Sequence, residues 1–349
     1  MIEIWYAILT FMLTMYVVLE GFDIGAGMLQ FVVGKTEAER RTVIAAIGPL
    51  WSWHEVWLLG FGGTLLLAFP AVLAVSFAGF YLALMLLLWG IILRGVSIEV
   101  SGHLADPLWR TLWHVCFVGS NLLLAVLIGA ALGNVLRGVP LGADGKFSLA
   151  FFTNFDPRGN VGILDWYTLS AAVFVVILFA AHGANGLAQR TEGPEHERSL
   201  AVARLLWMVV PVLLAIVTLE TWQVRPEVLS RVLHQPFGWL GLMAIVVGLA
   251  GVFARLHGRR ESGALLASSL FIAGLMIAGA TGIFPLVLYS TLGPEHSMSA
   301  YQTAAAGHGL SIALVWWPIA ALLSIGYFVF IYRYYSGKVK PVQDTQMPY

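Results

Sequence analysis

The stretch VWLLGFGGTLLLAFPAVLAVSFAGFYLALMLLLWGIIL, residues 56–93, contains no Asp, Glu, Lys, Arg or His. A helix that crosses the hydrocarbon core of a bilayer needs roughly 20 apolar residues, so this stretch is too long for one crossing. Pro70 lies near its middle. We therefore predict two transmembrane helices, at about 53–70 and 72–93, joined by a tight turn.

The rest of the chain has the same character. Of its 349 residues 59% are hydrophobic and 11% are charged, and the mean hydropathy is +0.84. Soluble domains carry roughly 25% charged residues, so lipid must cover much of this surface. Further spans are expected at about 4–32, 111–136, 164–188, 203–221, 236–255, 263–285 and 306–333. The sequence thus predicts an all-α polytopic membrane protein with about nine transmembrane helices, forming a single domain over 1–349.

Lys and Arg gather on the cytoplasmic side of membrane proteins. An odd number of crossings places the termini on opposite sides. If the amino terminus is outside, 14 of these residues fall in inside segments and 5 in outside segments. The inside set is Lys35, Arg40, Arg41, Arg94, Arg110, Arg190, Arg198, Arg204, Arg255, Arg259, Arg260, Arg333, Lys338 and Lys340, and the outside set is Arg137, Lys146, Arg158, Arg225 and Arg231. We expect the amino terminus outside and the carboxyl terminus in the cytoplasm.

A weak internal echo predicts a repeat. Gly21-Phe22-Asp23-Ile24-Gly25 in the first span is echoed by His182-Gly183-Ala184-Asn185-Gly186 in the fifth. The repeat halves would be 1–136 and 164–285, giving two four-helix units, with the last helix, 306–333, at the periphery. The long outside segments 137–163 and 286–305 are expected to be irregular.

Glu20 and Asp23 lie inside the first span, three residues apart and hence on one helix face. Ionisable groups at membrane depth are costly, so they have a partner or a task. The functional interpretation is a proton relay or cation site; the alternative is a pair capped by polar side chains of another helix. His54 and Glu55 follow Trp51, Ser52 and Trp53, where a proton-handling role competes with an interfacial one. Position 58 is Leu, so no zinc motif begins at His54.

His114, His182 and His308 stand alone in apolar helices. Each could ligate a haem iron, although a hydrogen bond to a neighbouring group is the commoner role. Asp165 and Glu220, at outer helix ends, are expected to face water. The single Cys116 excludes an internal disulfide and Cys-based metal or haem attachment. Equal numbers of basic and acidic residues, 19 each, give no sign of nucleic-acid binding.

Several segments, in order along the chain, resemble subunit II of the cytochrome bd quinol oxidases, including the cyanide-insensitive branch. The densest similarity lies in 16–125. The segments are Glu20–Leu29, Glu37–Arg41, Ile47–Trp51, Glu55–Leu58, Phe69-Pro70, Phe77–Tyr81, Trp109-Arg110, Phe284-Pro285 and the tyrosine-rich stretch Tyr327–Tyr335.

The resemblance implies a haem-free structural subunit of an electrogenic quinol:oxygen oxidoreductase in the bacterial inner membrane. Haems b and d would lie in a homologous subunit I, with quinol as substrate and quinone also serving as a structural lipid in some members. Some complexes of this family hold a small single-helix subunit as well. Asp23, Glu20 and Glu55 become proton-path candidates. Ser52 replaces an Asp of the family's proton path, so His54 or Glu55 is expected to substitute for it. A secondary transporter is the alternative, because parallel repeats and intramembrane acids occur there too.

Overall fold

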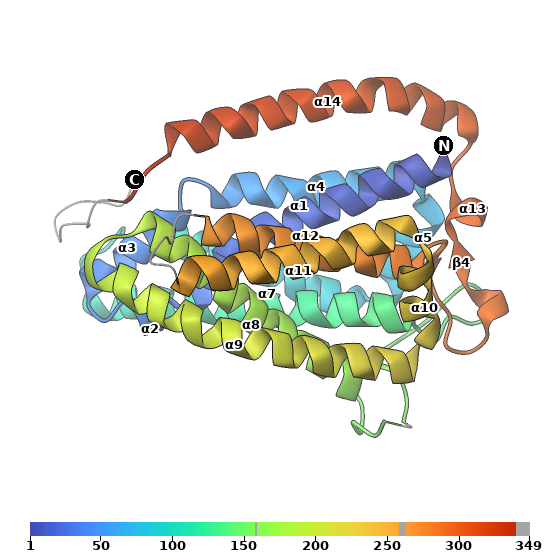
Figure 1. Cartoon of the computed structure of the whole chain (residues 1–349), viewed down its shortest axis with the longest axis horizontal. Coiled ribbons are helices and arrows are strands. Elements are labelled where there is room, and N and C mark those ends of the chain that lie inside the picture. Colours follow the sequence, from blue (N-terminus) through green and yellow to red (C-terminus); the bar gives the residue numbers. More distant parts are fainter. Residues whose placement is uncertain (158, 258–262, 340–349) are drawn as a thin grey trace.

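The computed structural model describes residues 1–157, 159–257 and 263–339 and shows long helices running side by side along one axis (Figure 1). The long helices are α1 (Ile2–Met28), α4 (Trp51–Ala68), α6 (Tyr81–Val100), α7 (Pro107–Arg137), α8 (Trp166–Arg190), α9 (Gly193–Val224), α11 (Pro236–His257), α12 (Ala264–Ile283) and α14 (Gly307–Tyr334). The shorter elements are α2 (Gln30–Val33), α3 (Glu37–Ile47), α5 (Pro70–Gly79), α10 (Pro226–His234), α13 (Ala300–Thr303), β1 (Ala150–Phe152), β2 (Gly162–Leu164), β3 (Leu286–Leu288) and β4 (Met298–Ser299).

Eight helices among the described residues are long and apolar enough to cross a membrane. This confirms an all-helical, multi-span protein. The ninth expected span corresponds to α4, which is not among the eight. Its first turn holds Ser52, His54 and Glu55, and these polar side chains lower its apolar character.

The break predicted near Pro70 is present, with Pro70 as the first residue of α5. The third predicted helix differs more. It is interrupted at Phe80 and then continues as α6 to Val100, seven residues beyond the uncharged stretch. Arg94, assigned above to an inside loop, is therefore a helical residue and is fully buried.

The centre of the bundle is the crossing of α1 and α8. In α8, 83% of the apolar stretch is buried, which is the highest share among the eight candidate membrane-spanning helices. A Cβ on Gly25 would overlap the Phe179 carbonyl, and one on Gly183 would overlap the backbone of α1. Small residues allow such close approach of helices in lipid. Both glycines belong to the two segments of the predicted repeat, and the repeat itself stays a prediction.

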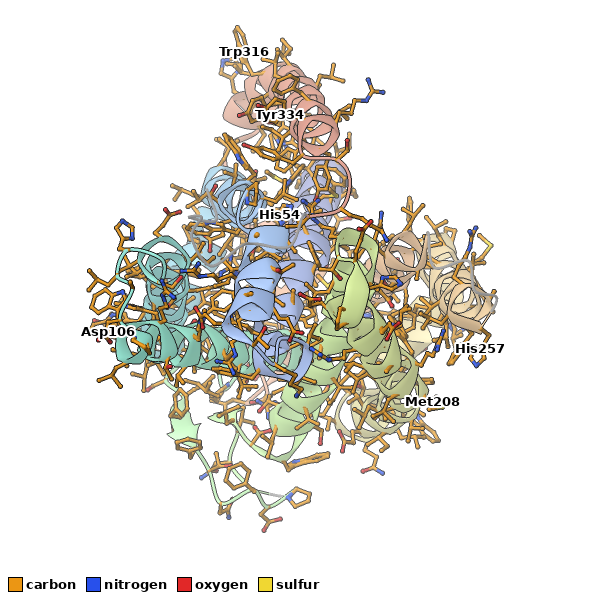
Figure 2. The ribbon with its side chains drawn as sticks, turned by 90° about the vertical axis from the view of Figure 1, so that its left-hand side faces the viewer. His54, Asp106, Met208, His257, Trp316 and Tyr334 are labelled. Carbon is orange, nitrogen blue, oxygen red and sulfur yellow. The ribbon has the colours of Figure 1, made fainter. Side chains whose placement is uncertain are left out.

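Helix α14 lies at the edge of the molecule, separated from α1 and α4 over most of its length (Figure 1). Only 6% of its apolar stretch is buried. Figure 2, an end-on view, shows Trp316 and Tyr334 standing well away from the bundle that contains His54. Aromatic contacts fasten α14 to α4, with Trp53 against Tyr327 and Trp57 against Phe328. The last helix is thus peripheral.

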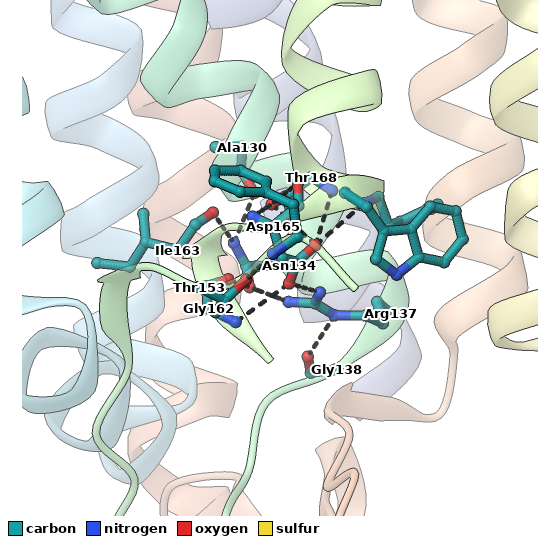
Figure 3. Close-up of polar contacts among 12 residues, drawn as sticks. Ala130, Asn134, Arg137, Gly138, Thr153, Gly162, Ile163, Asp165 and Thr168 are labelled. Carbon is teal, nitrogen blue, oxygen red and sulfur yellow. Dashed lines mark hydrogen bonds and ion pairs between the residues drawn. The ribbon is translucent and has the colours of Figure 1, made fainter. Parts of the chain in front are cut away.

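The two long segments predicted to lie outside, 137–163 and 286–305, are more ordered than expected and lie together. Strands β1 and β2 pair in parallel, β3 and β4 pair antiparallel, and Val139 bridges to Ser290 between the segments. The expectation that Asp165 faces water is wrong. Asp165 is buried, caps α8 and pairs with Arg137, which also donates to Asn134 Oδ1 at 2.6 Å (Figure 3).

Four cations counted above as loop charges are buried structural groups: Arg41, Arg94, Arg137 and Arg225. Arg225 donates to the Leu136 carbonyl at 2.9 Å and lies over the Tyr289 ring. Without them, the predicted inside segments still hold more Lys and Arg than the predicted outside segments. The orientation of the chain in the membrane stays a prediction. Arg158, Arg259, Arg260 and Lys340, also counted there, lie outside the described residues.

Candidate functional site

A cluster of buried ionisable side chains lies where α1 ends and α4 begins. Glu20 and Asp23 lie in the last three turns of α1, His54 in the first turn of α4, and Arg94 on the buried face of α6. All four are at most 1% exposed. Oxygen and nitrogen atoms of Glu20, Asp23 and His54 lie within 4.8 Å of one another. Residues from three helices are thus gathered into one site, which we call the charge cluster, together with Glu55.

One half of the charge cluster is a hydrogen-bonded chain. His54 Nδ1 lies 2.6 Å from Asp23 Oδ2, and His54 Nε2 lies 2.7 Å from the Tyr332 hydroxyl of α14. An ionised carboxylate only accepts, so Nδ1–H donates to Asp23 and Nε2 accepts from the tyrosine. Tyr332 is 38% exposed, whereas Asp23 and His54 are fully buried. The chain therefore connects the edge of the bundle with its interior.

The other half is an ion-pair network around Arg94. Its guanidinium donates to Glu20 and lies 3.3 Å from Glu55 Oε1. The Trp51 ring lies 5.7 Å from the same guanidinium. Unpaired charges are expensive in a low-dielectric interior, so one arginine shared by two carboxylates stabilises both. Glu20 and Asp23 have separate partners on other helices, Arg94 and His54, as in the alternative interpretation of a pair capped by polar side chains of another helix.

The charge cluster leaves several buried polar atoms without a hydrogen bond within the described part of the chain. The acceptors are Glu20 Oε2, Asp23 Oδ1 and Glu55 Oε1, and the donors are Arg94 Nε and Nη2. Arg190 adds a further positive field near Asp23 and Tyr332. Acceptors of this kind take a proton or a water molecule readily. A divalent cation fits less well, because Arg94 already neutralises Glu20 and would repel it.

Of the predicted proton-path residues, the structure brings together Glu20, Asp23, His54 and Glu55. Ser52 is exposed and takes no part in the charge cluster. Sequence reasoning missed Arg94 and Tyr332. Arg94 directly follows the uncharged stretch, and its role would have been visible only if the helix had been extended past residue 93. Tyr332 lies 278 residues from His54, and a single sequence gives no sign of that contact.

The haem-ligand candidates do not fit a haem. His182 is fully buried, but Nε2 donates to the Val18 carbonyl at 3.0 Å and Nδ1 lies 2.7 Å from the Ser268 hydroxyl. Both ring nitrogens of His114 are also engaged, by Glu37 and Gln30. His308 is exposed at the start of α14. Hydrogen bonding is thus the observed role of the two buried histidines.

An apolar cavity of about 570 Å³ lies among the helices, beside the amino-terminal part of α1. Leu13, Leu84, Leu132 and Phe179 are among its lining residues, and Tyr6 and Thr10 supply polar groups. Its size is in the range of ligand pockets, and its lining suits an apolar molecule.

Comparison with known proteins gives a consistent result. A profile of the family described as cytochrome bd terminal oxidase subunit II matches residues 1–335. The chain is 28% identical to a probable cytochrome oxidase subunit 2 of Haemophilus influenzae, over 96% of this chain and 94% of that protein. It is 28% identical to the cytochrome bd-I ubiquinol oxidase subunit 2 of Escherichia coli K12, over 92% and 90% of the two chains.

The Bacillus subtilis cytochrome bd ubiquinol oxidase subunit 2 is 27% identical over 99% of this chain and 98% of its own. Among solved structures, a chain of the bd oxidase from Geobacillus thermodenitrificans superposes with a TM-score of 0.71 at 16% identity, covering 96% of this chain and 98% of that one. The fold is therefore shared over nearly the whole length.

Proposed function

The chain belongs to the cytochrome bd terminal oxidase subunit II family, and we propose that it is the haem-free, proton-supplying subunit of a quinol oxidase. It is a multi-pass membrane protein and a subunit of an oxidoreductase complex. Its partner would be a homologous subunit I that carries haems b and d in a bacterial inner membrane. The complex would oxidise ubiquinol or a related quinol and reduce oxygen to water.

The observation that carries the proposal is the charge cluster. Reduction of oxygen to water consumes protons, and a proton reaches a buried centre through groups within hydrogen-bond reach of one another. Ionisable residues at membrane depth are costly and mark such relays. Tyr332, His54 and Asp23 form a continuous hydrogen-bonded chain from a partly exposed tyrosine to a fully buried carboxylate.

His54 is suited to pass a proton because both of its ring nitrogens lie in the chain. One nitrogen can accept a proton as the other releases one. Asp23 would receive the proton, while Glu20 and Glu55 stay paired with Arg94 and set the local field. The route in this protein would thus use His54 in place of the carboxylate that Ser52 replaces.

The haem-free role is supported by the histidines described above, none of which offers a suitable buried nitrogen. The apolar cavity supports a second part of the proposal, that a quinone or another lipid is held as a structural component. Its apolar lining would bind an isoprenoid chain, and Tyr6 would contact the polar head group of the bound molecule. With the family shown, no observation favours the secondary transporter.

The test is oxygen consumption and inside proton uptake by the purified complex in vesicles, with Asp23→Asn compared to wild type. Loss of the carboxylate removes the proton acceptor of the chain, so uptake and turnover should slow together, or the complex should fail to assemble. Ser52→Ala is the control and should resemble wild type, because Ser52 is exposed. Wild-type turnover and assembly in Asp23→Asn would refute the proposal.

A further inference from the structure

A second polar network lies near the same end of the bundle, apart from the charge cluster. Glu37 of α3 accepts from His114 Nε2 of α7, with both carboxylate oxygens at 3.1 Å. Gln30 Nε2 of α2 lies 3.0 Å from His114 Nδ1 and also donates to the Arg40 carbonyl at 3.2 Å. The second bond fixes the orientation of the amide. A neutral His114 therefore carries its proton on Nε2, facing Glu37.

This network runs from the surface into the core. The side chain of Glu37 is 29% exposed, that of His114 is 1% exposed, and Gln30 is fully buried. Arg41 lies 3.5 Å from Glu37, and Arg110 is the other cation in its field. The hydrogen bond from His114, with Arg41 and Arg110 assisting, lowers the pKa of Glu37. Glu37 is therefore a partly hydrated carboxylate that faces a buried imidazole.

Polar groups continue from this network toward Asp23 along the seam between α1 and α7. Asp23, Gly27 and Gln30 are spaced by four and three residues and share one face. His114 and Asn121, seven residues apart, share one face of α7. The amide of Asn121 packs directly against Gly27. These faces of α1 and α7 are therefore in contact. Along the bundle axis, Asn121 lies between Gln30 and Asp23.

Three buried oxygens along this seam have no hydrogen-bond partner among the described residues: Gln30 Oε1, Asn121 Oδ1 and Asp23 Oδ1. All three side chains are fully buried. Buried acceptors are almost always satisfied, commonly by ordered water. Helix packing alone does not require a row of such acceptors in an otherwise apolar bundle.

We propose that Glu37 and His114 form the intake of a proton route that follows the α1–α7 seam past Gln30 and Asn121 to Asp23. The inference rests on the proposed function and adds a second intake that reaches Asp23 beside the Tyr332–His54 chain. Water bound to the three oxygens connects His114 with Asp23.

In the transfer step the imidazole of His114 takes up one proton and releases one. The starting state differs from the one observed here: Gln30 has released the Arg40 carbonyl and turned its amide, Nδ1–H faces Gln30 Oε1, and Nε2 can accept a proton. Glu37, protonated from bulk water, gives its proton to Nε2, so an O–H bond breaks and an N–H bond forms. Water takes the proton from Nδ1 and passes it inward. The ring is then in the tautomer observed here, with Gln30 donating to Nδ1. Rotation of the ring about its Cβ–Cγ bond resets it, so that no proton returns to Glu37.

The experiment compares four variants of the full complex in vesicles, with proton uptake from the inner side measured across about pH 6 to 8. Glu37→Gln should slow uptake about tenfold, in line with loss of one proton-transfer group, and most strongly at high pH. Glu37→Asp should recover most of the rate. Glu39→Gln is the matched control, because Glu39 lies on the same helix but pairs with Arg198 at 2.7 Å. Its uptake rate and pH profile should be those of wild type.

His114→Ala should be slow and should regain rate when imidazole is added, a response that a purely structural role would not give. If Glu37→Gln keeps the wild-type rate and pH profile while Asp23→Asn is slow, the intake lies elsewhere and this inference is wrong, although the proposed function stands. If Asp23→Asn is itself unaffected, the proposed function fails with it.

Discussion

Replacing Arg94 with Gln is the sharpest test of the charge cluster's energetics. The arginine is fully buried and is shared by Glu20, which is 1% exposed, and Glu55, which is 18% exposed. Removing it leaves two carboxylates without their cation. Breaking a buried ion pair from one side costs about 3–5 kcal/mol, because the remaining charge is uncompensated. We expect a loss of that size in the free energy of unfolding.

A double-mutant cycle separates the ion pair from general packing. In Arg94→Gln/Glu20→Gln two neutral amides face each other and no uncompensated charge remains at Glu20. The double variant should therefore be more stable than the sum of the single losses predicts, by about 2 kcal/mol. Arg204→Gln is the control, since Arg204 is exposed and its one described bond is to the Leu256 carbonyl.

The assay is unfolding of the purified complex in mixed dodecyl sulfate micelles, followed by helical circular dichroism. The reasoning is refuted if Arg94→Gln costs no more than Arg204→Gln. It is equally refuted if the two single losses simply add, because Arg94 and Glu20 would then be energetically independent.

Three further predictions concern other parts of the chain. Hydrogen bonding to Arg198 holds the pKa of Glu39 at about 2, below its ordinary 4.5. Because the folded value is the lower one, the stabilisation from this carboxylate is fully present above about pH 4.5 and is lost as the pH falls toward 2. Stability followed by circular dichroism should fall as the pH is lowered from 4.5 toward 2 in wild type, and Glu39→Gln should lack this contribution. Gly183→Ala should lower the thermal midpoint and the yield of complex, at a cost of about 1–3 kcal/mol or more, because its Cβ meets the backbone of α1. Gly119→Ala, with nothing within 4 Å, should be tolerated, and equal effects of the two would contradict the close α1–α8 crossing. Tyr332→Phe should slow proton uptake without displacing α14, since the aromatic contacts of Tyr327 and Phe328 remain; unchanged uptake would remove Tyr332 from the relay.

Much of the fold could be predicted from the sequence because lipid imposes simple rules. Long apolar stretches gave most helices, and Pro70 marked the break between α4 and α5. The ends of the helices were predicted less well, because a helix continues through polar residues when those residues have partners inside the protein. Arg94 shows this directly: α6 extends beyond the apolar stretch because Glu20 and Glu55 receive the guanidinium.

The site could be predicted in part. Carboxylates in an apolar helix are conspicuous, so Glu20 and Asp23 were found without any contact information. Their partners come from α4, α6 and α14, and tertiary packing decides which of these faces meet. Asp165 illustrates the same limit, since its position at a helix end predicted water contact whereas Arg137 covers it. His114 was recognised as unusual, but its bond to Glu37 depends on how α3 folds back onto α7.

The most direct test of the central claim is a gentle purification of this chain from its native membrane, with a reduced-minus-oxidised visible spectrum taken before and after its partners are removed. We predict haem d absorption and a second large membrane chain in the intact complex, and no Soret band from this chain alone. A Soret band that stays with the separated chain, or a colourless chain purified without such a partner, would contradict the account.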